Sequence, residues 1–326
     1  MIAVEQEVPP ASARRRSGAS PEWSARRRRR GRADRLPYGL LLPSAAIIAA
    51  VLGYPLYKLF ATSFQHFGLR QLFLHTTDWT GLANYQAVFT DGFFWTVVLR
   101  TVVFTAVNVA LTIGVGMLVA LLLKRVGRVV RTLVTVAMIM AWVMPSVTSP
   151  IVWGWLFETQ YGVVNWLLTQ TSLGNFTNTD WFGRSPLLAF TVITLMVVWQ
   201  AVPFVALSLY AGLSQVPGEL YEAAWMDGGA SWAVFRRITL PMLKPILLLL
   251  TILSTIWDFS VFNQIWILTG GGPNQGTVTL GIWSYIKAFG GSQFGEGAAI
   301  AVVSVILLVA VSVYYVRQLV RSGEVA

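Results

Sequence analysis

The sequence predicts an all-α membrane protein with six transmembrane helices. Hydrophobic residues make up 55% of the 326 positions and charged residues only 12%, whereas about a quarter of an ordinary soluble domain is charged. Six apolar stretches reach the length of about 20 residues that a helix needs to cross a bilayer. Lysine and arginine are unevenly divided between the segments that join these stretches. Lipid must therefore surround most of this chain.

The six stretches are each expected to form one span. They run near 38–63, 94–123, 132–156, 187–212, 245–267 and 297–316. The first exceeds the apolar core of a signal peptide, which is about 7–15 residues long, so we interpret it as a retained helix. Pro145 and Pro150 are expected to bend the third span. Aromatic and polar residues predict partial order in the outer segments 64–93 and 157–186.

The basic residues predict the orientation of the bundle. With the N-terminus in the cytoplasm, 19 of the 24 lysines and arginines fall on the inner side, as the positive-inside rule requires. Both termini are therefore expected in the cytoplasm. We expect a basic tail over 1–37, a membrane domain over 38–318 with an inner loop over 214–241, and a short tail over 319–326. The ten arginines of the first tail favour a topology determinant over nucleic-acid binding.

Several kinds of chemistry lack their residues in this sequence. There is no cysteine, and the two histidines, His66 and His75, are too few for a histidine-based metal centre. A phosphate-binding loop needs a lysine followed by serine or threonine, and none of the four lysines is followed by either. The sequence thus predicts a non-enzyme with no cofactor of its own. Uphill transport would need ATP bound by a partner, or an ion gradient acting through a charge inside the membrane.

The inner loop over 214–241 has the pattern of two short helices. Pro217 suits a helix start and Gly228 a left-handed helix end. Ser231 is expected to cap a second helix that Pro241 helps to terminate. Ala223 and its neighbour Ala224 would let another protein's backbone approach. The alternative is an interfacial helix with no protein partner.

The same loop resembles the signature of binding-protein-dependent ABC importer permeases. That signature is Glu-Ala-Ala, three residues, Gly, nine residues, Ile, one residue and Leu-Pro. The matching residues are Glu222, Ala223, Ala224, Gly228, Ile238, Leu240 and Pro241. Outside the loop, the chain is similar to the carbohydrate branch, which contains the larger maltose permease subunit and the glycerol-phosphate permease. Further matching stretches are Leu41-Leu42-Pro43, Tyr54-Pro55, Asn84-Tyr85, Tyr161-Gly162 with Asn165, and Leu268 to Pro273.

The resemblance implies a type I ABC importer transmembrane domain in the inner membrane of a bacterium. Its implied partners are a second homologous permease subunit, two ATPase subunits that bind ATP and Mg, and an extracytoplasmic solute-binding protein. The implied contact with the ATPase is the loop around Glu222, Ala223, Ala224, Asp227 and Gly228. The implied substrate is a sugar. The arginine-rich tail and the Ala-, Val- and Trp-rich composition hint at a high-GC bacterium, for which we favour trehalose or a related disaccharide. This chain lacks the extra spans and large outer domain of the larger maltose subunit.

Polar residues within the spans are the candidates for the substrate pathway, because they are costly in lipid and usually functional. They are Asn108, Trp199, Gln200, Asp258, Asn263 and Gln264. Amides and a carboxylate suit sugar hydroxyls, and an indole suits the apolar face of a pyranose.

Each of these assignments has an alternative. Asp258 could join helices through Arg100, and the amides could hold spans together; for Asn108 the scaffold role is favoured. A glycerol-phosphate permease would need Arg100 as its intramembrane cation. A secondary transporter would use Asp258 as a proton site, but it would leave the loop around Glu222 unexplained.

Overall fold

The computed structural model describes residues 36–171 and 174–321, so most of the predicted basic tail lies outside the described residues. The chain divides into two compact units, 1–58 and 59–326, which are described separately. Within the described part, five helices are long and apolar enough to cross a membrane. A sixth span results if one sharply bent pair is counted as a single crossing. The prediction of an all-α membrane fold is confirmed.

The first span is an almost entirely apolar helical run. It consists of α2 (Leu36–Ile48), a π-helical turn η1 (Ala49–Gly53) and α3 (Tyr54–Ser63), whose last residues belong to the second unit. The stretch Leu40–Ser63 satisfies the length and hydropathy of a membrane span. It corresponds to the predicted span at 38–63.

The segment between the first two spans is ordered, as the sequence predicts. It contains β1 (Gln65–His66), α4 (Leu69–Leu74), β2 (Asp78–Trp79) and α5 (Ala83–Thr90), and the two strands pair antiparallel. The buried Asn84 donates from Nδ2 to the carbonyl oxygens of Ser63 and Gln65, at 2.9 and 2.8 Å. These bonds hold α5 against the end of the first span.

The second span, α6 (Gly92–Arg125), is the longest single α-helix described. Asp91 caps its start by accepting a hydrogen bond from the Phe93 amide at 2.9 Å. Lys124 and Arg125 lie in its last turn, where cations are favourable to the helix dipole. Arg131 then donates to the carbonyls of Leu123 and Val126 and so satisfies the helix end.

The third span is broken into α7 (Arg128–Val143) and α8 (Thr148–Leu156), which meet at 106°. Pro145 explains the break, because a proline lacks the amide hydrogen and pushes the residue before it toward an extended conformation; Met144 has ψ 128°. Pro150 lies in the first turn of α8, where proline is tolerated. The predicted bend is therefore present and falls at Pro145, not at Pro150.

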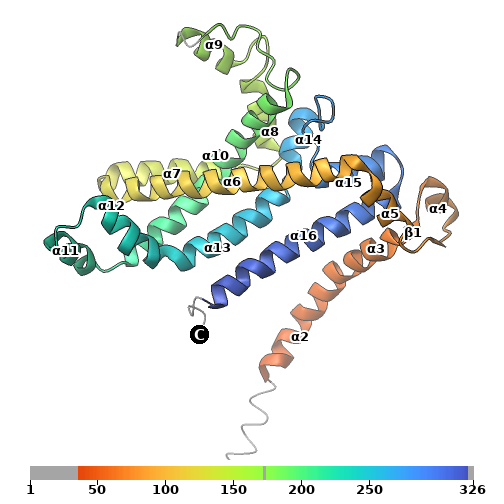
Figure 1. The fold of residues 1–326 in the computed structure, drawn as a ribbon, viewed down its shortest axis with the longest axis horizontal. Coiled ribbons are helices and arrows are strands. Elements are labelled where there is room, and N and C mark those ends of the chain that lie inside the picture. The colour runs from red at the N-terminus through yellow and green to blue at the C-terminus, as the bar shows by residue number, and fades with distance from the viewer. Residues whose placement is uncertain (1–35, 172–173, 322–326) are drawn as a thin grey trace, which may run out of the picture. The chain divides into compact units, whose positions relative to one another are not determined.

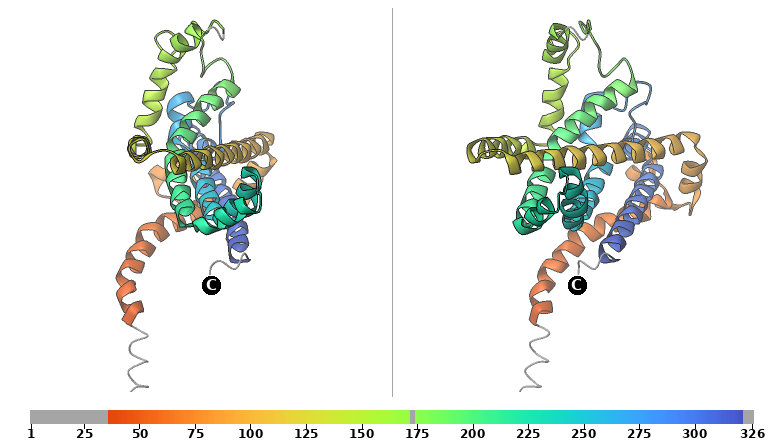
Figure 2. Two further views of the ribbon diagram at one scale, coloured as in Figure 1. Left: turned by 90° about the vertical axis from the view of Figure 1, so that its left-hand side faces the viewer. Right: turned by 60° about the vertical axis from the view of Figure 1, so that its left-hand side comes forward.

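A second ordered connecting segment follows, with α9 (Val163–Gln170), before α10 (Pro186–Gln215) forms the fourth span. Ser185 caps α10 and Pro186 opens it, as is typical of a helix start. α10 packs along α6 so closely that a Cβ at Gly116 would contact the side chain of Val205. In Figures 1 and 2, α9 and α11 (Gly218–Met226) lie at opposite ends of α10.

The fifth span departs from the prediction at its inner end. α12 (Ser231–Val234) continues through the π-turn η2 (Phe235–Thr239) into α13 (Leu240–Phe259). Ala230, not Ser231, is the N-cap of α12. Pro241 lies at the beginning of α13, directly after η2, and the helical path continues past it. The expectation that Ser231 caps this helix and Pro241 terminates it is therefore wrong.

The remaining elements complete the bundle. After a break at 260–262 come α14 (Asn263–Thr269), α15 (Leu280–Tyr285), the π-turn η3 (Ile286–Gly290) and the sixth span, α16 (Phe294–Arg321). Lys287 and Glu296 form an ion pair of 2.9 Å between η3 and α16.

The core has two apolar clusters with a polar layer between them. One cluster includes Phe104 on α6 and Val261 after α13, and the other includes Met117 on α6 and Leu250 on α13. Between these positions, the buried residues of the two helices are mostly polar. They are Thr105, Asn108, Thr112, Ser254 and Asp258.

Candidate functional site

The inner loop after α10 presents one exposed face and is anchored on the other. Lys124 Nζ lies over the Tyr221 ring, 4.3 Å from its centroid, in a cation–π contact. The Tyr221 hydroxyl lies 3.2 Å from Thr239 Oγ1. These contacts fix α11 to the ends of α6 and η2. Glu222 and Ala223, the next two residues, are exposed. Glu222 and Ala223 of the signature are thus turned outward, whereas Ala224 and Ile238 are half-buried.

Gly228 gives α11 its sharp end. The Gly228 amide donates to the Trp225 carbonyl at 3.0 Å, and the Gly229 amide donates to the Ala224 carbonyl at 2.8 Å. This pair of bonds is the Schellman motif, which needs a left-handed residue at this position; Gly228 has φ +74°. Asp227 is the C-cap residue before it. The predicted left-handed helix end at Gly228 is confirmed.

Three large apolar side chains surround the exposed end of α11. Trp225 is 60% exposed, Met226 87% and Trp232 70%. The sequence interpretation centred on Glu222 and the alanines and missed these residues. Their position beside the helix end at Gly228 was a signal that could have found them. Together with Glu222 and Ala223 they form a mixed apolar and acidic surface.

The break in the third span brings several of the predicted pathway residues together. Gln200 on α10 donates from Nε2 to the Met144 carbonyl at 2.8 Å. Asn263, the first residue of α14, donates from Nδ2 to Ser146 Oγ at 3.1 Å. Two amides from the fourth and fifth spans therefore bind the two sides of Pro145. Gln264 follows Asn263 and is half-buried.

Aromatic rings line the same region. The Trp199 and Trp153 rings lie 5.8 Å apart, and the Trp142 ring stacks on Phe204 at 5.5 Å. Phe204 also contacts Trp257, at 5.3 Å. Trp199, Trp142 and Trp257 remain 37 to 44% exposed. We name the residues Trp142, Ser146, Trp199, Gln200, Trp257 and Asn263 the break surface.

Asn108 and Asp258 lie elsewhere, inside the polar layer of the core. Asn108 is fully buried and donates to the Phe104 carbonyl at 2.8 Å, while its Oδ1 has no hydrogen-bond partner among the described residues. Asp258 is 4% exposed, and its Oδ2 likewise lacks a described partner. Neither side chain reaches the break surface through a hydrogen bond in the described part of the chain.

Arg100 does not pair with Asp258. Its Nη1 donates to the carbonyls of Gln275 and Val278, at 2.8 and 2.9 Å. These carbonyls belong to the segment that follows α14, so the arginine ties the second span to that segment. The alternative in which Asp258 joins helices through Arg100 is therefore not what the structure has.

Comparison with known proteins identifies the family. The model of the family "Binding-protein-dependent transport system inner membrane component" matches residues 112–323. The chain is 42% identical to the diacetylchitobiose uptake system permease protein DasB of Streptomyces coelicolor, over 99% of both chains. It is 35% identical to the sulfoquinovosyl glycerol permease SmoG of Agrobacterium fabrum, over 87% of this chain and 90% of that one. It is 32% identical to the trehalose/maltose permease MalF of Thermococcus litoralis, over 88% and 94%.

A solved structure shares the fold. The chain of a bacterial ABC transporter involved in alginate import superposes with a TM-score of 0.75 at 19% identity, over 93% of this chain and 99% of that one. The sequence relatives, the family match and this fold agree. The chain therefore belongs to the binding-protein-dependent transport system inner membrane components, and it is a non-catalytic, membrane-spanning permease subunit of an ABC importer.

Proposed function

We propose that this chain forms half of the translocation pathway of an ATP-driven importer for a neutral disaccharide built from N-acetylated amino sugars. The observation that carries the substrate class is the 42% identity, over 99% of both chains, to a permease of a diacetylchitobiose uptake system. The trehalose/maltose relative is less similar, at 32%. Diacetylchitobiose accordingly replaces trehalose as the favoured substrate.

The break surface suits such a ligand. Gln200 and Asn263 offer amide groups that can donate to and accept from hydroxyl and acetamido groups. Exposed indoles can cover the apolar face of a sugar ring. In this conformation the two amides bind Met144 and Ser146 of the chain itself. A sugar would replace these bonds, with Gln264 as an additional amide.

The buried polar residues have a different part in this proposal. Asn108 and Asp258 are almost inaccessible within this chain, so a sugar could reach them only after a large rearrangement of α6 and α13. We assign them to the internal polar layer of the subunit, where hydroxyl and amide groups stabilise helix contacts.

Coupling to ATP is assigned to the surface around Glu222. Its partner would be one of two ATPase subunits, which bind ATP and Mg, while a second homologous permease completes the pathway and an external solute-binding protein delivers the sugar. The exposed Glu222, Trp225 and Met226 support a protein partner over a bare interfacial helix, because a carboxylate beside the apolar residues disfavours anionic lipid.

The alternatives fit less well. A phosphate would need an intramembrane cation; Arg100, the candidate, donates from Nη1 to two carbonyls of this chain, and the relatives compared above are sugar permeases. Proton-coupled transport through Asp258 requires no ATPase, whereas the family to which the chain belongs is part of ABC importers.

The test is uptake by the reconstituted transporter. The chain would be assembled in liposomes with its second permease, its ATPase subunits and its solute-binding protein, and supplied with labelled diacetylchitobiose, trehalose or glycerol phosphate. We expect saturable uptake of diacetylchitobiose that needs internal ATP and stops with an inactive ATPase variant. Uptake of glycerol phosphate alone, or uptake driven by a proton gradient without ATP, would contradict the proposal.

A further inference from the structure

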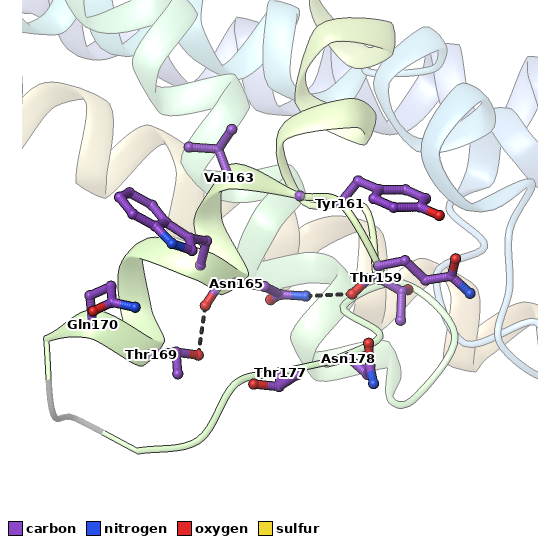
Figure 3. Close-up of a pocket in the computed structure, with 11 residues that line it drawn as sticks. Thr159, Tyr161, Val163, Asn165, Thr169, Gln170, Thr177 and Asn178 are labelled. Carbon is purple, nitrogen blue, oxygen red and sulfur yellow. Dashed lines mark hydrogen bonds between the residues drawn. The ribbon is translucent and has the colours of Figure 1, made fainter.

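The outer segment between α8 and α10 forms an open cavity that the proposed pathway does not use. Its volume is about 510 Å³, within the usual range of about 300–1,000 Å³ for small-molecule sites. Figure 3 shows Tyr161 and Gln170 on opposite sides of Asn165, with Thr177 and Asn178 on the loop that faces them. The complete lining is Thr159, Gln160, Tyr161, Gly162, Val163, Asn165, Trp166, Thr169, Gln170, Thr177 and Asn178.

The hydrogen bonds of a buried asparagine, Asn165, hold the walls of this cavity in place. Asn165 is buried and donates from Nδ2 to the carbonyls of Thr159 and Thr179, each at 3.1 Å. Its Oδ1 accepts from Trp181 Nε1 at 2.7 Å. The Trp181 ring stacks on Phe176 at 6.2 Å and 4°. One buried amide thus joins both sides of the cavity.

The turn at the mouth is fixed in the same way. The Glu158 carboxylate accepts from the amides of Gln160 and Tyr161, at 2.7 and 2.6 Å. Gly162 lies so near the Glu158 backbone that a Cβ there would overlap its carbonyl oxygen. Both bonds go to Oε2 of this carboxylate, which therefore fixes the backbone turn at the mouth.

The groups left free around the cavity are neutral and polar. Within the described residues, the side chains of Gln160, Gln170 and Asn178 have no hydrogen-bond partner, although each amide offers two donors and an acceptor. Trp166 is 62% exposed and Tyr161 81%. None of the lining residues carries a charge.

This chemistry selects the class of ligand. An anionic headgroup or a phosphate would need a cation in the wall, and none lines it. Free amides bind hydroxyl and acetamido groups, and exposed aromatic rings cover apolar sugar faces. The lining therefore favours a neutral saccharide.

The cavity is also on the side from which substrate arrives. It lies before the start of α10, and the surface around Glu222 follows the end of α10. A helix of 30 residues is about 45 Å long, which exceeds the hydrocarbon thickness of about 30 Å. The cavity and the ATPase-facing loop are thus on opposite sides of the membrane.

We propose that this cavity is a second saccharide site, which receives one or two neutral sugar rings outside the membrane before they enter the pathway. The inference rests on the proposed sugar import. It differs from that proposal in its location, because none of its lining residues belongs to the break surface.

Cysteine labelling tests the site directly, because the chain has no native cysteine. Thr177→Cys places a thiol in the wall, and Thr77→Cys places one at an exposed position of the other outer segment, outside the cavity. The assembled transporter, without its solute-binding protein, would be treated with a membrane-impermeant maleimide and increasing diacetylchitobiose. Sugar at ten times its Kd should slow labelling of Thr177→Cys about tenfold and leave Thr77→Cys unchanged.

A second variant identifies the contact. Trp166→Ala in the Thr177→Cys background should abolish the protection, since it removes the ring on which the sugar rests. Unprotected labelling in a preparation that imports the sugar would overturn the second site while leaving the import function intact. Protection by sugar-free binding protein alone would also overturn it, because the surface would then be a protein contact. If the transporter without any substitution imported no sugar at all, that result would instead count against the proposed function.

Discussion

The polar residues inside the spans differ in what their side chains contact. Gln200 and Asn263 reach across to the backbone and hydroxyl of the broken third span. Asn108 and Asp258 point into the bundle and leave an oxygen without a partner in the described part of the chain. From the sequence alone both pairs are simply polar groups at membrane depth, because a sequence gives depth more readily than rotation about the helix axis.

Substitutions should separate these two pairs. Gln200→Leu removes the amide and leaves a shorter apolar side chain, so transport per assembled complex should fall about tenfold, as expected for a lost hydrogen bond of about 1.5 kcal/mol. Asp258→Asn keeps the shape and removes a charge that lacks a cation. It should leave uptake per complex and assembly unchanged, because the side chain keeps its shape and stays buried in the polar layer. Uptake and thermal unfolding of purified complexes measure both effects.

A different outcome would move the assignment. A fall in uptake per complex with Asp258→Asn, at normal assembly, would return that carboxylate to the substrate pathway. Normal uptake with Gln200→Leu would remove the break surface from it.

At the scale of elements, the informative features are the interruptions of helices. Gly228 predicts a left-handed turn from the sequence alone, because few other residues adopt that conformation. Pro145 likewise predicts a bend in the third span. The size of the bend, 106°, could not be predicted, because the broken region contacts the side-chain amides of Gln200 on α10 and Asn263 on α14, which are distant in sequence. The continuous path from α12 to α13 was missed because Pro241 suits a helix start as well as an end.

The turn at Gly228 gives a test of coupling that does not depend on contacts within this subunit. A Cβ added at this position would have no heavy atom of the chain within 4 Å, so within the subunit a substitution there acts through the backbone alone. Gly228→Ala should strain the Schellman turn by about 1–2 kcal/mol and weaken ATPase binding and uptake, and Gly228→Val should do more. Gly228→Asn should retain more activity, because asparagine tolerates this conformation.

Gly218→Ala is the matched control. Gly218 opens α11 and also has no atom within 4 Å of a Cβ, but its φ is not in the left-handed region. Equal losses at both positions would mean that the conformation of Gly228 is not what matters. Co-purification of the ATPase with each variant, together with uptake, provides the measurement.

For the whole molecule, composition and the lengths of the apolar stretches were enough to predict a helical membrane fold, of which the described part has five spans, or six with the bent pair. They could not divide the molecule internally, since the polar layer between the two apolar clusters arises from how α6 and α13 pack. The orientation in the membrane stays a prediction from the basic residues, 19 of which would be cytoplasmic.

That orientation can be tested across one helix. Asn175 lies in the outer segment before α10, and Ser214 lies in its last turn; about 45 Å of helix separates the two ends. In this cysteine-free chain, Asn175→Cys should react with an impermeant maleimide added outside intact cells. Ser214→Cys should react only after the cells are permeabilised. Lys124, Arg131 and the other basic residues near this end of α10 resist translocation and so keep it on the cytoplasmic side. Reaction of both cysteines from outside would contradict a membrane-spanning α10. Labelling of Ser214→Cys alone from outside would show that the chain has the opposite orientation in the membrane. The inverted pattern would also place the saccharide cavity inside the cell and the Glu222 surface outside it, so this one measurement constrains both the second sugar site and the assignment of the ATPase contact.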